Sequence, residues 1–92
     1  MTGITSSGFE FEINDNIKED WRFLKAVAMA DSTDESDQIK GYTDIVTILL
    51  GSAGEKRLMK HVEQDGIVPV KAINQEVLEM IKALKTDKEI KK

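Results

Sequence analysis

The residues of this 92-residue chain that could perform catalysis or bind metals form no catalytic or metal-binding signature. Its single histidine, His61, lies near Lys60 and Glu63, and the chain contains no cysteine. One imidazole without thiolates or paired carboxylates at ligand spacing does not form a zinc site. A catalytic histidine also needs a partner that orients its ring, and the sequence indicates none. We therefore expect a surface histidine in a protein that is not an enzyme and has no metal and no cofactor.

Two further segments match ligand-binding loops only in part. The stretch GSAGEKR at 51–57 has two glycines ahead of a predicted helix, but it lacks the Gly-x-x-x-x-Gly-Lys-[Ser/Thr] spacing and the preceding strand of a P-loop. The stretch DSTDESDQIKGY at 31–42 has Ser36 and Tyr42 where a calcium loop needs Gly and a bidentate Glu. A tight turn between helices and a solvated linker explain the two stretches better.

The composition limits the classes of partner. Thirteen Lys and Arg stand against 17 Asp and Glu, which gives a net charge of −4. Because phosphate neutralisation supplies most nucleic-acid affinity, we expect no nucleic-acid partner. No apolar run reaches the ~20 residues that span a bilayer, and the N-terminus lacks the features of a secretory signal, so we expect no membrane partner. The chain predicts one soluble domain over 1–92, with residues 1–7 and 86–92 flexible.

Residues 8–13 predict a β-strand, because apolar and polar residues alternate along them. Its apolar face consists of Phe9, Phe11 and Ile13. A single strand leaves its backbone groups unpaired and needs a second strand. Two candidates remain open: the extended segment at 66–70, which we favour, and the same strand of a neighbouring subunit.

The rest of the chain predicts a mainly α-helical fold, a small bundle of about four helices. Apolar periodicity and capping residues place these helices at about 16–31, 37–50, 52–64 and 70–85, with Gly51 as the end of the second helix.

The first predicted helix contains the only tryptophan. Its apolar residues fall at helical spacing and predict one wide apolar face: a stripe of Ile17, Trp21, Leu24 and Ala28, with Phe23 and Val27 beside it. Tryptophan is enriched in cores and at protein interfaces. For Trp21 we favour the core, with an interface as the alternative.

Three short motifs lie in order along residues 8–85, after the strand FEFEI: D-W-x-x-L, I-L-L-G and D-G-x-V-P-V. Together with the sequence of strand, helix, polar linker and further helices, they resemble the small tail assembly chaperones of long-tailed bacteriophages, in the short form without a frameshifted extension. None of the three motifs is diagnostic alone, and the resemblance depends on their order and spacing.

The resemblance implies a chaperone that binds the tape measure protein and keeps it soluble until tail-tube subunits polymerise around it. It implies a homo-oligomer, and contact with the tail-tube protein through a longer frameshifted form. It places the protein in the cytoplasm of the infected bacterial host and makes it absent from the mature virion. It implies no catalytic residue.

The residues expected to contact partners or other copies are the apolar ones of the strand, the tryptophan and the thin stripe of the third predicted helix. They are Phe9, Phe11, Ile13, Trp21, Leu58, Met59 and Val62.

Two alternative functions remain. The segment LLGSAGEKRLMKH could supply the turn and basic helix of a small phage DNA-binding regulator of the helix-turn-helix type. Its basic cluster would be Lys56, Arg57, Lys60 and His61, and four such groups in an acidic protein give a weak phosphate footprint. The other alternative is a structural adaptor of the virion.

Overall fold

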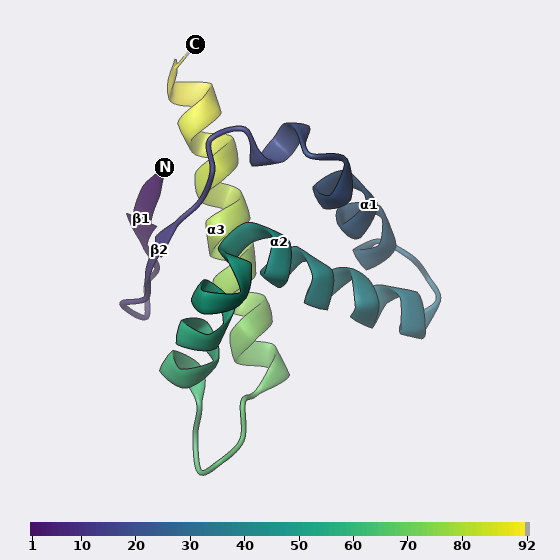
Figure 1. The fold of residues 1–92 in the computed structure, drawn as a ribbon, viewed down its shortest axis with the longest axis vertical. Helices are drawn as coiled ribbons and strands as arrows, with labels where there is room; N and C mark the ends of the chain where they lie inside the picture. Colours follow the sequence, from purple (N-terminus) through teal and green to yellow (C-terminus); the bar gives the residue numbers. More distant parts are fainter. Residues whose placement is uncertain (92) are drawn as a thin grey trace.

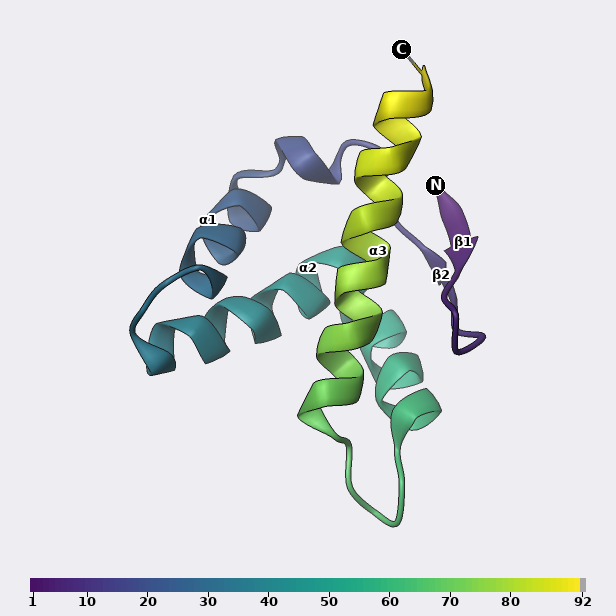
Figure 2. The ribbon, with the colours of Figure 1, turned by 180° about the vertical axis from the view of Figure 1, so that it is seen from behind.

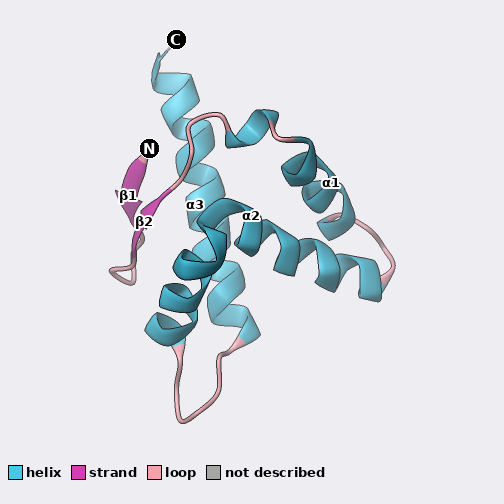
Figure 3. Cartoon of the chain, viewed as in Figure 1, coloured by secondary structure: helices cyan, strands magenta, loops and turns pink. Residues whose placement is uncertain are grey.

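The computed structural model describes the backbone of residues 1–91 and the side chains of residues 1–85. This part of the chain contains two strands, a short 3-10 helix and three α-helices (Figure 1, Figure 3): β1 (Thr2–Ile4), β2 (Glu10–Glu12), η1 (Ile17–Glu19), α1 (Trp21–Ala30), α2 (Glu35–Val62) and α3 (Val70–Lys91). The mainly helical fold is confirmed, with three helices rather than four. We expected residues 86–92 to be flexible. Their side chains lie outside the part of the chain that the structure describes, so this expectation stays a prediction.

The N-terminal residues form a β-hairpin with the predicted strand. β1 pairs antiparallel with β2, in the register that places Gly3 opposite Phe11. The turn closes through a 2.9 Å hydrogen bond from the amide of Gly8 to the carbonyl of Thr5. The expectation that residues 1–7 are flexible is therefore wrong, because residues 2–4 are the missing partner strand.

The segment at 66–70 is not the partner of the strand, contrary to the expectation we favoured. Its backbone closes a turn of its own in the loop between α2 and α3. There the amide of Ile67 donates to the carbonyl of Gln64 at 3.0 Å, and the reverse bond is 2.8 Å long. The backbone groups of Gln64 and Ile67 bond to each other, so they are not available to pair with β2.

Helix α2 is sharply kinked where the sequence predicted a helix end. Gly51 has φ 71° and ψ 173°, a backbone conformation that essentially only glycine adopts without strain. The helix resumes at once, so the second and third predicted helices form one kinked element. A 2.8 Å hydrogen bond from the hydroxyl of Thr47 to the carboxylate of Glu55 spans the bend.

Helix α1 packs on the first half of α2 through the edge of the predicted apolar face that contains Phe23, and not through the predicted stripe. Its buried residues are Phe23 and Ala26, whereas Trp21 and Leu24 are exposed. The prediction failed because the helix does not begin near residue 16. Asp20 has an extended backbone conformation, with ψ 125°, and separates η1 from α1. Ile17 and Trp21 therefore do not lie on one helical face.

The core is one cluster of buried residues to which the hairpin, η1 and all three α-helices contribute. Its most deeply buried side chains are Ile13, Leu58, Val77 and Met80. The molecule measures 43 × 32 × 19 Å, so it is thin in one direction. Seen from the front and from behind, α1 with the first half of α2 forms an arm on one side of α3, and the hairpin lies on the other (Figure 1, Figure 2).

Candidate functional site

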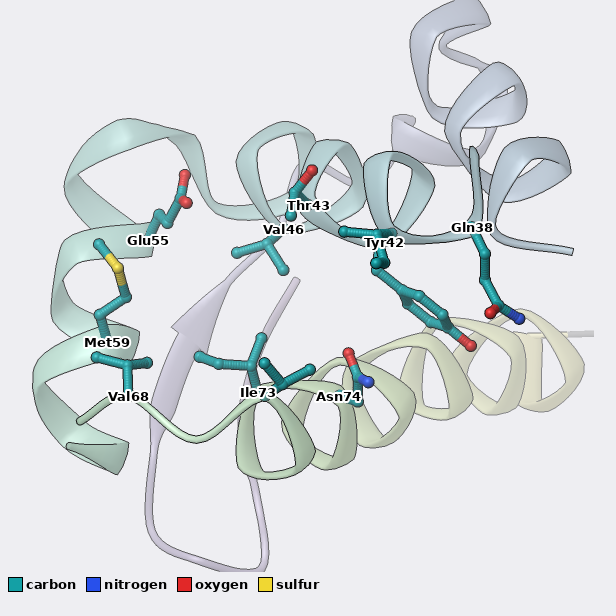
Figure 4. Close-up of a pocket in the computed structure, with 11 residues that line it drawn as sticks. Gln38, Tyr42, Thr43, Val46, Glu55, Met59, Val68, Ile73 and Asn74 are labelled. Carbon is teal, nitrogen blue, oxygen red and sulfur yellow. The ribbon is translucent and has the colours of Figure 1, made fainter. Parts of the chain in front are cut away.

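An apolar groove of about 350 Å³ lies between α2 and the start of α3. Its apolar lining comes from both halves of α2, from the following loop and from α3: Ile39, Tyr42, Val46, Met59, Val68, Val70 and Ile73. In Figure 4, Val46 and Ile73 face each other between the helices, and Met59 and Val68 lie together at one end of the groove. The polar lining residues are Gln38, Thr43, Glu55 and Asn74.

The kink at Gly51 creates this groove. A straight α2 would present one face to α3, whereas the bend makes two walls that meet at an angle. Val46 belongs to the wall before the kink and Met59 to the wall after it. The first turn of α3 closes the third side with Ile73. The groove therefore depends on one backbone conformation, which only glycine readily supplies.

Two large apolar side chains at the groove remain in contact with water. Ile39 is 57% exposed and Val70 is 73% exposed. A groove with an apolar floor and exposed apolar residues at its edge is the type of surface that receives an amphipathic helix or a ligand.

A second apolar surface lies on the outer face of α1. Trp21 is 72% exposed and Leu24 is 51% exposed. They are three positions apart, so they are neighbours on the helix surface. The face opposite them packs on α2, because Phe23 and Ala26 are buried there.

The start of α1 is fixed by a charged cap. The Asp20 carboxylate accepts a 2.8 Å hydrogen bond from the amide of Arg22 and another of 2.8 Å from its guanidinium. The guanidinium hydrogen bonds, with the backbone bond beside them, lower the pKa of Asp20 to about 2. Trp21 is the first residue of the helix capped in this way, so its backbone position is defined even though its side chain is exposed.

A polar cluster holds the hairpin turn on α3. The buried carboxylate of Glu76 accepts hydrogen bonds from the hydroxyls of Thr5, at 2.6 Å, and Ser7, at 2.9 Å. Ser6 donates its amide and hydroxyl to Glu79, at 2.8 and 2.7 Å, and these bonds lower the pKa of Glu79. These four bonds join the turn to the helix, so they fix the hairpin in place.

The same cluster brings a serine close to the histidine, as a nucleophile and base would be. The Ser7 hydroxyl lies 3.0 Å from His61 Nε2. The carboxylate of Glu76, however, binds the hydroxyl and not the imidazole. A nucleophile of this type needs a base that a third group orients. Among the described side chains no hydrogen bond orients His61 in that way, so this part of the chain shows no third group of a catalytic triad.

The basic residues of the helix-turn-helix alternative are partly occupied by the hairpin. Arg57 donates to the carbonyl of Glu10 at 2.7 Å, and its guanidinium lies 5.2 Å from the centre of the Phe9 ring. The His61 ring is 5.4 Å from the same Phe9 ring, centre to centre. Of the four basic groups, these two face the protein itself, which weakens a role in phosphate binding.

Five of the seven residues predicted to contact partners are buried in this structure, because the hairpin packs them against α2 and α3. They are Phe9, Phe11, Ile13, Leu58 and Val62. As core residues they are not available to a partner, so the choice of these five as surface contacts is wrong for this fold. Met59 lines the groove and Trp21 is exposed.

Sequence reasoning missed most of the groove lining. Ile39, Val70 and Ile73 were not among the residues expected to contact partners, because nothing in the periodicity distinguishes a groove wall from a core face. The available signal was the combination of Gly51 with apolar residues on both sides of it. A glycine that bends a mostly apolar helix leaves part of its surface uncovered.

No known protein family, curated protein or solved structure matches the chain. Among the described helices, none is long and apolar enough to cross a membrane.

Proposed function

We propose that this protein is a tail assembly chaperone of a long-tailed phage, which binds a helical segment of the tape measure protein in the groove between α2 and α3. In this role it is non-enzymatic and keeps the tape measure protein soluble before the tail tube polymerises. It works as a homo-oligomer in the cytoplasm of the infected host and is absent from the mature virion. A longer frameshifted form supplies the contact with the tail-tube protein.

The observation that carries the proposal is the apolar lining of the groove beside exposed Ile39 and Val70. An amphipathic helix places apolar anchors at i, i+3 or i+4 and i+7, which span about 10 Å along its axis. A volume of about 350 Å³ accommodates a few such side chains rather than a whole helix, so the rest of the client would stay outside. Such shallow capture suits a chaperone that must release its client.

The charge of the protein suits the same role. Each copy adds a net charge of −4 to a complex whose client has apolar surface to hide. Net charge of one sign keeps such complexes soluble and apart from one another. Several copies along one client would also bind more tightly than one, since each later copy acts at a raised local concentration.

Co-expression with the tape measure protein of the same phage tests the proposal. The wild-type chain should keep the tape measure protein in the soluble fraction. Val70→Asp puts a charge at the groove edge and should abolish this effect. Ile67→Asp is the matched control, because Ile67 is 66% exposed, close to the 73% of Val70, but does not line the groove. Both variants should fold, since neither replaces a buried side chain.

Two outcomes of this experiment contradict the proposal. An insoluble tape measure protein beside the wild-type chain would remove the chaperone assignment. Equal losses with Val70→Asp and Ile67→Asp would remove the groove as the binding site. Mass spectrometry of purified particles gives a further test, since presence of the chain in the virion would favour a structural adaptor instead.

Trp21 provides an independent test on the outer face of α1. Because its side chain is 72% exposed, Trp21→Ala should leave the free energy of unfolding within about 0.5 kcal/mol of wild type. We expect the same variant to keep less tape measure protein soluble. The wild-type tryptophan fluorescence should shift to shorter wavelength when the client is added. An unshifted spectrum on a bound client would show that this face takes no part in binding.

A further inference from the structure

The backbone hydrogen bonds of the hairpin determine which strand edge is free. The amide of Ile13 donates to the carbonyl of Met1 at 2.8 Å, and the amide of Thr5 donates to that of Phe9 at 2.9 Å. In an antiparallel ladder, hydrogen-bonded and non-hydrogen-bonded pairs alternate. Gly3 therefore bonds to β2, whereas the amides and carbonyls of Thr2 and Ile4 point away from it.

The outward edge of β1 is open. Thr2 and Ile4 are both exposed, with Ile4 at 65%, and no hydrogen bond between described residues engages their outward backbone groups. In the front and rear views β1 lies outside β2, on the side away from α1 (Figure 1, Figure 2). Two backbone amides and two carbonyls thus form a ready template for another strand.

The opposite edge of the hairpin is less suited to such pairing. Arg57 already bonds to the carbonyl of Glu10 there at 2.7 Å. The side chains that flank this edge, Glu10 and Glu12, are both acidic and would repel the same edge of another copy. β1 carries no charged side chain and no proline, which are the usual devices that protect an edge strand.

We infer that β1 pairs antiparallel with β1 of a second copy, which joins the two hairpins into one four-stranded sheet across a two-fold axis. Centred on Gly3, this register sets Thr2 of each copy opposite Ile4 of the other. The outward amides and carbonyls of these residues then form four hydrogen bonds. This hydrogen-bond pattern is self-complementary, as a two-fold interface between identical chains requires.

The side chains permit this arrangement. Thr2 and Ile4 would form β-branched cross-strand pairs on the outer face of the sheet, which are favourable. On the inner face, a Cβ at Gly3 would lie 2.7 Å from the Phe11 ring, so the absence of a side chain lets that ring cover the strand. The two β2 strands would be three strand spacings apart, about 14 Å. Their glutamates are then separated by more than the ~8 Å Debye length at physiological salt.

The inference deepens the self-association that is part of the proposed function, but its test needs no client. The strands are three residues long, so the interface is small and the dimer should dissociate within the micromolar to millimolar range. Sedimentation velocity of the full chain with a free N-terminus, from about 1 μM to about 1 mM, should show a monomer–dimer equilibrium.

Two variants with one matched control locate the interface. Ile4→Lys places a charge on the edge, and Ile4→Pro removes an amide that the hairpin itself does not use. Both should weaken dimerisation at least tenfold without loss of the hairpin. Ile67→Lys makes the same change at a side chain that is 66% exposed, against 65% for Ile4, but away from the sheet. It should dimerise as the wild type does.

Amide hydrogen exchange tests the register. Protection of the amides of Thr2 and Ile4 should rise with protein concentration, whereas that of Gly3, which bonds within the hairpin, should already be high in the monomer. A wild-type monomer at every concentration would overturn the inference, as would equal dimerisation of Ile4→Lys and Ile67→Lys. A monomer that still keeps the tape measure protein soluble would overturn the dimer alone and leave the chaperone assignment standing.

Discussion

The contact between α1 and α2 depends on a glycine that allows two helix backbones to approach closely. A Cβ at Gly41 would lie 2.7 Å from the carbonyl oxygen of Ala26 and 2.7 Å from the carbonyl carbon of Met29, and closer still to the amide nitrogen of Ala30. These are backbone atoms and cannot rotate away. For ordinary contact of at least 3.4 Å, α1 must move by 0.7 Å or more.

Gly41→Ala is therefore expected to destabilise the protein. Overpacking against rigid atoms costs about 3 kcal/mol, at the upper end of the usual range. Alanine recovers about 1 kcal/mol in a helix interior, since glycine has the poorer helix propensity. The net loss is about 2 kcal/mol, which lowers the melting temperature of a domain of this size by roughly 8–16 °C.

Thermal and urea unfolding followed by circular dichroism would measure this loss. Ser36→Ala, at an exposed position of the same helix, should change the stability by no more than about 0.5 kcal/mol. An alanine at position 41 that leaves the melting temperature unchanged or raises it would show that α1 does not pack this closely on α2. The register of Ala26 and Ala30 against Gly41 would then have to be abandoned.

Two further predictions concern the helix cap and the hairpin clamp. The pKa of Asp20 is about 2 in the folded protein against an ordinary 3.8, so its stabilising effect is complete above about pH 4 and is lost as the pH falls through about 2. Asp20→Asn retains a capping oxygen without the titrating charge, and a plot of melting temperature against pH should fall less between pH 4 and 2; an unchanged acid limb would contradict the role of this carboxylate. Thr5→Val leaves the carboxylate of Glu76 and the amide of Phe9 each without one bond, and should cost about 1–3 kcal/mol in urea unfolding, against no measurable loss for the exposed Thr33→Val.

The sequence was informative where a pattern has one physical solution. The alternation through Phe9, Phe11 and Ile13 required one buried face, and all three are buried. Gly51 after an apolar run required a break in the helix, and the backbone bends there. Period and glycine conformation are local properties, so the sequence alone was sufficient for both.

The failures have a different origin, because they depend on tertiary contacts. Residues 2–4 have no strand pattern of their own, and the ladder to β2 and the bonds from the turn to Glu76 make them a strand. The apolar stripe through Trp21 was plausible as a helical face, but Gly41 lets the small residues of α1 make the closest contact instead. The pattern of apolar residues in α1 contains no information about Gly41, which lies on α2.

The groove and the free edge of β1 lie on different sides of α3, so the two proposed interactions are compatible. Val70 lines the groove, and Glu79, nine positions later, holds the hairpin turn through Ser6. At about 100° per residue, these two positions face opposite directions around the helix. A dimer formed through β1 would therefore leave both grooves open, and one dimer could hold two segments of one client. Weak capture in each groove would then combine into tight binding, which is lost when the dimer dissociates. Variants of Ile4 should accordingly weaken client retention at low chaperone concentration and much less at high concentration, whereas variants of Val70 should weaken it at both.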